Sequence, residues 1–175
     1  HFATAGEDGT VVVWEAGGPK EIKEIKAHDS AVYDLEFSPD GKTLATASTD
    51  KTVKLFDWET GKENAKLEGH EDAVWAVTYS KDGSLIATGG ADRKIKLWDA
   101  NGALKTTLEG HKDWVSSIAF SPDGKQLAAA DYGRTVKLWN IELAINLADE
   151  VNQTAAKLKE NIDRKSTRLN SSHTS

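Results

Sequence analysis

Hydrophobic and polar residues alternate in short runs along most of this chain, a period typical of β-strands with one buried face. The clearest run is Val32–Ser38, and it leads into the turn sequence Ser-Pro-Asp-Gly at 38–41. Two further runs, Leu44–Ser48 and Thr52–Trp58, are rich in β-branched and aromatic residues. A fourth run follows Gly61. The pattern therefore predicts four short strands joined by turns.

This group of four runs recurs along the chain. Copies begin at His28, His70 and His111, at intervals of 42 and 41 residues, and a partial copy runs from Phe2 to Glu15. No segment before Leu143 has helical periodicity, so the repeat is predicted to be all-β. The predicted repeat units are 1–27, 28–69, 70–110 and 111–142.

Short motifs within the repeat identify a family. Gly-His stands at Gly69-His70 and Gly110-His111, Trp-Asp stands at Trp98-Asp99, and an aspartate occupies the tight turn of most copies. From Phe2 to Asn140 the chain resembles the WD-repeat family, whose blades of about 40–45 residues form a β-propeller. Closing such a ring takes about 4–8 blades. We therefore expect an incomplete propeller of about three and a half blades, an open arc with exposed sheet edges, as a fragment of a longer protein.

The resemblance also implies a role for the repeated polar residues. In this family a histidine, a serine or threonine, an aspartate and a tryptophan form a buried chain of hydrogen bonds in each blade. Only the unit that begins at His70 has the full set, because Phe56 replaces one tryptophan, and Ala129 and Gly133 replace the threonine and aspartate of the last unit. The residues assigned to this network are His70, Thr88, Asp92 and Trp98, then His28, Thr46 and Asp50, then Thr4, Asp8 and Trp14, and finally His111 and Trp139. We expect one well-anchored blade among weaker ones.

A histidine beside an aspartate and a threonine could also form a catalytic triad or a metal site. Here the same group recurs in successive units, and three of the five histidines occupy the repeat position. The chain contains no cysteine, which removes thiolate nucleophiles and cysteine ligands. We therefore interpret the cluster as scaffold, and expect no catalytic residue, no metal and no cofactor.

Composition narrows the class of partner. The formal net charge is −6, and no basic block of the kind that binds nucleic acid is present, so we expect no nucleic-acid partner. No apolar run approaches the roughly 20 residues that cross a bilayer, so we expect no membrane partner. The absence of cysteine agrees with a reducing compartment, and we expect a cytoplasmic location.

The resemblance places the loops that carry the repeated histidine on one face of the propeller. Aromatic side chains among charged ones are typical of protein interfaces. The alternative is that Trp75 and Trp114 cover the channel or pack between blades. The candidate partner-binding residues at these loops and strand starts are Tyr33, Trp75, Trp114, Ser116, Tyr132, Asp72 and Asp113.

After Asn140 the period changes. Apolar residues recur at helical spacing, which predicts an amphipathic helix or C-terminal extension over 143–162. The alternative is that this segment is a chimeric join. From Asp163 to His173 the chain reads DRKSTRLNSSH, the in-frame translation of a widely used sequencing adapter, so 163–175 is interpreted as an adapter-derived, disordered tail. The apolar positions of the predicted helix are Leu143, Leu147, Val151, Leu158 and Ile162.

Three functions are weighed. The favoured one is a protein-interaction scaffold that presents a propeller face to other proteins or peptides, without catalysis of its own. The second is a regulatory or sensor region of a larger signalling ATPase or kinase, because regular repeats with Ser-Pro-Asp-Gly-Lys turns resemble those of bacterial multidomain proteins. The third, a propeller enzyme, would need titratable groups that converge on the channel, and no histidine or cysteine is left for that purpose.

Overall fold

The computed structural model describes residues 1–18 and 20–171, with side chains described through Ile162, and it divides into two compact units. The first unit, His1–Ile141, is built from β-strands. Their bounds are β1 Phe2–Ala5, β2 Thr10–Trp14, β3 Glu21–Lys26, β4 Val32–Phe37, β5 Thr43–Ser48, β6 Val53–Asp57, β7 Lys62–Leu67, β8 Val74–Tyr79, β9 Leu85–Gly90, β10 Ile95–Asp99, β11 Leu104–Leu108, β12 Val115–Phe120, β13 Gln126–Asp131 and β14 Val136–Asn140.

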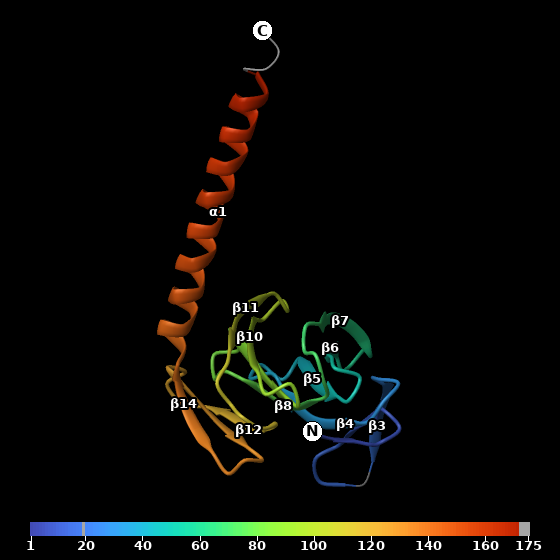
Figure 1. Cartoon of the computed structure of the whole chain (residues 1–175). Coiled ribbons are helices and arrows are strands. Elements are labelled where there is room, and N and C mark those ends of the chain that lie inside the picture. The colour runs from blue at the N-terminus through green and yellow to red at the C-terminus, as the bar shows by residue number, and fades with distance from the viewer. Residues whose placement is uncertain (19, 172–175) are drawn as a thin grey trace. The chain divides into compact units, whose positions relative to one another are not determined.

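The strands form four antiparallel sheets, each from neighbours in sequence (Figure 1). β4–β7 and β8–β11 are four-stranded, whereas β1–β3 and β12–β14 are three-stranded. The sheets do not close into a ring, and one face of the edge strand β14 exposes Val136 and Leu138. The fold is an incomplete β-propeller, as the sequence predicts.

The first strands of successive blades pack side by side, because β4 and β12 both lie against β8. Two carboxylates of β4 join the second sheet to the third. Asp34 Oδ2 accepts a hydrogen bond of 2.9 Å from the Val77 N–H, and Glu36 Oε2 accepts one of 3.1 Å from the Tyr79 N–H. Burial raises the pKa of Asp34, against the effect of the Val77 and Leu35 backbone N–H groups that donate to its carboxylate. The two blades are therefore linked by polar bonds as well as by apolar contact.

The hydrophobic core lies between the blades. One cluster combines Leu55 and Leu67 of the second sheet with Val74 and Ile86 of the third. Another combines the first sheet with the second and includes Val11, Ile25, Leu44 and Phe56. Each such side chain contributes roughly 1.5–3 kcal/mol when fully buried. A blade thus buries its faces against its neighbours, as expected for a repeat protein.

The turn between the first two strands of the second, third and fourth sheets is closed by a serine and an aspartate. The serine hydroxyl donates to the aspartate Oδ1 at 2.6 Å in all three copies, and the same oxygen accepts a backbone N–H two residues later. These bonds hold the pKa of each turn aspartate below its ordinary value. The pairs are Ser38 with Asp40, Ser80 with Asp82, and Ser121 with Asp123.

The second unit is a single helix, α1, Ile141–Ser171. It begins before the predicted position 143 and continues through 163–171, where the sequence indicated a disordered tail; residues 172–175 lie outside the described residues. The reason is local, because 141–171 contains neither glycine nor proline to interrupt a helix. In the described residues, no helix combines the length and hydrophobicity needed to cross a membrane.

Candidate functional site

The unit that begins at His70 carries a complete hydrogen-bonded chain of four side chains. His70 Nδ1 lies 2.8 Å from Asp92 Oδ2, and His70 Nε2 lies 2.8 Å from Thr88 Oγ1. The Trp98 indole N–H donates to the same hydroxyl at 3.0 Å. Burial disfavours the charged form of Asp92, but bonds from His70 and from the backbone N–H of Glu71 and Lys94 outweigh it and lower its pKa. The carboxylate therefore stays ionised and orients the imidazole.

The preceding unit repeats this arrangement without the indole. His28 Nδ1 lies 2.7 Å from Asp50 Oδ2, and His28 Nε2 lies 2.8 Å from Thr46 Oγ1. Phe56 is buried at the tryptophan position and offers no donor. Burial lowers the pKa of His28, although Asp50 opposes this effect. Burial also opposes ionisation of Asp50, but hydrogen bonds from Thr52 and His28 prevail and lower its pKa.

The last unit corrects one expectation from the sequence. With Gly133 at the position of the turn aspartate, His111 was expected to lack a carboxylate. The structure gives it Asp131, whose Oδ2 lies 2.8 Å from His111 Nδ1. Asp131 is the last residue of β13 and does not lie in the turn. Its side chain is buried. Hydrogen bonds from His111 and from the Thr135 N–H lower its pKa. An aspartate two positions before the missing one was the available sequence signal.

The hydrogen-bonded network around His111 is incomplete on the side of Nε2. Ala129 occupies the threonine position, so its side chain offers no hydroxyl to join the ring nitrogens. Among the described side chains, His111 Nε2 and Trp139 Nε1 are both buried without a hydrogen-bond partner. A buried polar atom in this state costs about 1–3 kcal/mol. The last blade thus has a polar defect at both groups that the missing hydroxyl would join.

In the partial copy at the start of the chain, the network consists of the bond between its tryptophan and its threonine. The Trp14 indole N–H donates to Thr4 Oγ1 at 2.9 Å. Asp8 Oδ1 accepts the Thr10 N–H at 3.0 Å within its own turn, apart from the bonded pair of Thr4 and Trp14. The sequence-predicted members of this copy are therefore only partly brought together.

Four aromatic side chains form a continuous row across three sheets. Tyr33 lies edge-on to Trp75 with ring centroids 4.3 Å apart, Trp75 is stacked on Trp114 at 5.9 Å, and Trp114 meets Tyr132 edge-on at 5.9 Å. We call Tyr33, Trp75, Trp114 and Tyr132 the aromatic surface. Tyr33, Trp114 and Tyr132 are 52%, 46% and 62% exposed, whereas Trp75 is partly covered. Trp75 therefore packs between its neighbours, and the other three carry the exposed area.

Polar candidates around the aromatic surface are held in place locally. Asp113 Oδ1 accepts the Trp114 N–H at 2.8 Å, and Asp72 Oδ1 accepts the Ala73 N–H at 2.8 Å. The Ser116 hydroxyl donates to the Ala130 carbonyl at 3.3 Å and so bonds within its own sheet. Asp113 thus bonds to the backbone of the aromatic residue Trp114, Asp72 bonds within its own loop, and the serine has a structural contact.

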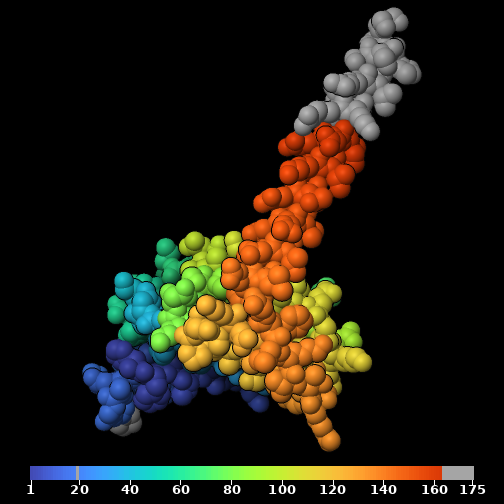
Figure 2. All heavy atoms as spheres, turned by 90° about the vertical axis from the view of Figure 1, so that its left-hand side faces the viewer, coloured from blue at the N-terminus to red at the C-terminus, as the bar shows by residue number. Residues whose placement is uncertain are grey.

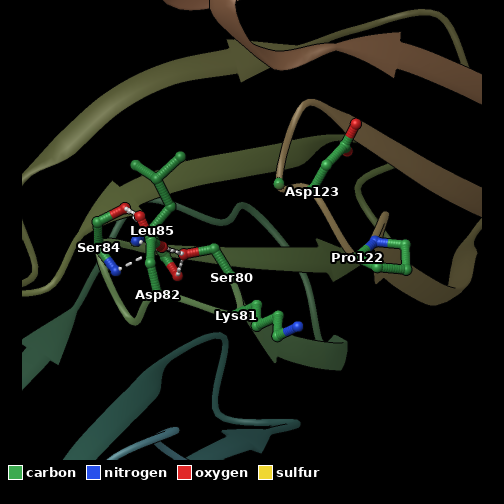
Figure 3. Close-up of a pocket in the computed structure, with 8 residues that line it drawn as sticks. Ser80, Lys81, Asp82, Ser84, Leu85, Pro122 and Asp123 are labelled. Atoms are coloured by element: carbon green, nitrogen blue, oxygen red, sulfur yellow. Dashed lines mark hydrogen bonds between the residues drawn. The ribbon is translucent and has the colours of Figure 1, made fainter.

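A groove of about 430 Å³ separates the Ser-Lys-Asp-Gly turn of one blade from the Ser-Pro-Asp-Gly turn of the next (Figure 3). Asp82 lies on one side, bonded to Ser80 and Ser84, and Asp123 lies on the other. Both carboxylates serve their own turns. Across the described residues, no group of three or more histidine, cysteine, aspartate or glutamate side chains is arranged to hold a metal ion.

Repeated sheets anchored by a histidine network define a repeat propeller of the WD type. A family model described as "WD domain, G-beta repeat" matches residues 19–57, 61–99 and 102–140, more than half of the chain. The chain belongs to the WD-repeat family. Repeats of this family generally mediate protein–protein interaction.

Two curated relatives show local similarity. The guanine nucleotide-exchange factor SEC12 of Rattus norvegicus and that of Mus musculus are each 44% identical to this chain over 41 residues. The match covers 23% of this chain and 10% of each relative. The chain therefore spans about a tenth of the length of the curated relatives it matches, which is about one repeat.

Proposed function

We propose that this chain recognises a partner protein or peptide through the aromatic surface and contributes binding rather than catalysis. The observation that supports this proposal is the row of rings from Tyr33 to Tyr132, three of them about half exposed. Tryptophan and tyrosine dominate the binding energy of protein interfaces, because they bury a large area with little loss of conformational freedom.

The aromatic surface is also rigid enough to serve as a binding site. Its rings stack on one another, and the Tyr132 N–H donates to the Trp114 carbonyl at 3.0 Å, which links the two loops that carry them. A surface already ordered in the free protein loses less entropy when a partner binds.

The arrangement of the histidines supports a binding role without chemistry. His28, His70 and His111 each have an aspartate on Nδ1. All three are buried, so their imidazoles are not available to a substrate. The network stabilises the blades, and the exposed aromatic row supplies the contacts that a partner would use.

Selection from a displayed library of random peptides tests the proposal. The full chain is the bait, and selected peptides are measured by titration against a variant with Trp114→Ser and Tyr132→Ser. We expect at least about a tenfold loss of affinity, in line with the loss of interface hot spots.

The matched control is Leu104→Ser, which removes an exposed apolar side chain from β11. It should leave affinity unchanged, and thermal unfolding should show that all variants are folded. Selected peptides that bind the double variant as tightly as the original chain would exclude the aromatic surface as the binding site.

A further inference from the structure

The helix α1 carries an apolar stripe along its described length. Leu147, Val151, Leu158 and Ile162 are 53%, 66%, 58% and 65% exposed. With Leu143 and Thr154, these positions fall within about 100° of the helix circumference at 3.6 residues per turn. A helix draws most of its stability from packing such a face, so an exposed stripe of this length indicates an interaction site.

The positions of the stripe are arranged symmetrically about its middle, with similar but not identical side chains at mirrored positions. About a centre between Asn152 and Gln153, Val151 mirrors Thr154, Leu147 mirrors Leu158, and Leu143 mirrors Ile162. If a second helix lies antiparallel on this face, every apolar layer of one copy meets an apolar layer of the other. A two-fold interface needs this self-complementarity, because the same surface serves both partners.

Thr154 fits an apolar seam despite its hydroxyl. Its Oγ1 donates to the Glu150 carbonyl of the same helix at 2.9 Å, so no donor is left unsatisfied when the face is covered. Val151, Thr154, Ala155 and Leu158 line a shallow groove at the middle of the helix, next to Glu150. The small side chains there allow a second helix to approach closely.

The charges select the antiparallel orientation. Glu150 and Lys157 lie on the same edge of the stripe, and the two-fold relation that aligns the apolar layers brings Glu150 of one copy close to Lys157 of the other, twice. In a parallel pair, the edge of one helix that carries Glu150 and Lys157 would face the opposite edge of the other helix, where Lys159 lies. Lys157 would then lie near a like charge. Charges that flank an apolar seam in this way set partner and orientation.

We propose that α1 pairs with α1 of a second copy of this chain as an antiparallel two-helix interface centred between Asn152 and Gln153. The described part of α1 is a single helix with a continuous surface, drawn in orange to red in Figure 2. The interface joins two copies of the chain into a dimer, so each dimer carries two aromatic surfaces.

Sedimentation equilibrium of the full chain tests the association. The chain should be dimeric at micromolar concentration, and Leu158→Asp should weaken the dimer at least about tenfold, as for a central interface residue. The matched control is Ala156→Asp, which adds the same charge on the opposite side of the same helix and should leave the dissociation constant within about twofold. Circular dichroism checks that helix content is unchanged.

A monomer at all concentrations would overturn the proposal. So would a dimer that resists Leu158→Asp but is broken by Leu138→Asp, since Leu138 is exposed on the edge strand β14 and would then be the contact.

Two further measurements test the orientation. Glu150→Lys and Lys157→Glu should each weaken the dimer several-fold, and the double charge exchange should restore it. Because the chain contains no cysteine, single cysteines can be introduced cleanly. Chains with Leu147→Cys should cross-link to chains with Leu158→Cys on oxidation, but neither should cross-link to itself. Homodimeric cross-links through position 147 would show a parallel pair and contradict the proposal.

Discussion

At the scale of single residues, the His70–Asp92 and His28–Asp50 pairs are not equivalent. The Asp92 side chain is 3% exposed, whereas that of Asp50 is 25% exposed. We expect Asp92→Ala to lower the free energy of unfolding by about 2–3 kcal/mol and Asp50→Ala by about 1 kcal/mol, because water can reach the groups that Asp50 leaves behind. Urea unfolding of both variants measures the difference, and equal losses would contradict it.

A second residue-scale prediction concerns the defect at Ala129. The Asp131 carboxylate accepts from His111 Nδ1–H, so Nε2 is an acceptor, while the Trp139 indole N–H is a donor. A threonine hydroxyl can satisfy both at once. We expect Ala129→Thr to raise the free energy of unfolding by about 1–2 kcal/mol, measured by urea titration.

The neighbouring residue Ala128 provides the control, because successive residues of a strand face opposite sides of the sheet. Ala128→Thr adds the same group away from His111 and should not stabilise. With Trp139→Phe as background, the gain from Ala129→Thr should shrink, since one of the two new bonds is lost. A gain of the same size in both backgrounds would show that the hydroxyl acts in some other way.

At the scale of elements, the tight turn between the second and third strands has one position with positive φ. Lys51, Arg93 and Arg134 occupy it at φ 74°, 66° and 65°, and Gly9 occupies it in the first sheet at φ 80°. This conformation costs a side-chain-bearing residue roughly 1–2 kcal/mol. We expect Arg93→Gly to raise stability by up to about 1 kcal/mol in thermal or urea unfolding, since glycine adopts it without strain.

The reverse change at Gly9 should be strongly unfavourable. A Cβ at Gly9 would lie 2.1 Å from the His28 carbonyl oxygen, which is a backbone atom and cannot move aside easily. Gly9→Ala should therefore cost more than the strain of positive φ alone. The free energy of unfolding is compared between alanine and glycine at positions 9 and 93. If alanine is equally unfavourable relative to glycine at both positions, backbone conformation and not this close approach governs the turn.

The sequence predicted the repeat and the strands well, because each strand is a local pattern of period two bounded by turn residues. It did not predict the contact between Asp131 and His111. The repeat pattern assigns the carboxylate to position 133 in the tight turn, whereas the Asp131 carboxylate reaches His111 from the end of β13. Nor did it predict the bonds from Asp34 and Glu36 to the next blade, which depend on how separate sheets face each other. The predicted helix ended at Ile162, because residues 163–175 were interpreted as an adapter-derived tail. Residues 163–171 contain no glycine or proline to interrupt a helix, and α1 continues through them.

At the scale of the whole molecule, stability passes from blade to blade through shared interfaces. The buried cluster that includes Leu55 and Val74 belongs to two sheets at once, and the bonds to Val77 and Tyr79 lie at the same junction. A local change in one blade therefore affects the neighbour that packs against it, as in other repeat proteins. For the same reason, titration of a buried histidine in one blade should change the unfolding of all the blades together.

The last prediction is a loss of stability on mild acidification that depends on His28. Its pKa is lowered in the folded state by burial, with Lys54 acting in the same direction and Asp50 against it. As the pH falls through about 6.5, the unfolded chain takes up a proton at this histidine before the folded chain does, so the free energy of unfolding decreases. The lowered pKa values of Asp50, Asp92 and Asp131 act in the same direction only at lower pH, near the ordinary range of aspartate.

Urea unfolding at about pH 7.5 and about pH 5.5 separates the two effects, because Asp50, Asp92 and Asp131, whose pKa values are lowered, are ionised at both pH values. In His28→Asn the amide can still donate to Asp50 but does not titrate. The variant should be less stable at both pH values, and its loss between them should be smaller than in the original chain. An equal or larger loss would place the acid sensitivity elsewhere, because the only titrating group removed is the imidazole that burial keeps neutral.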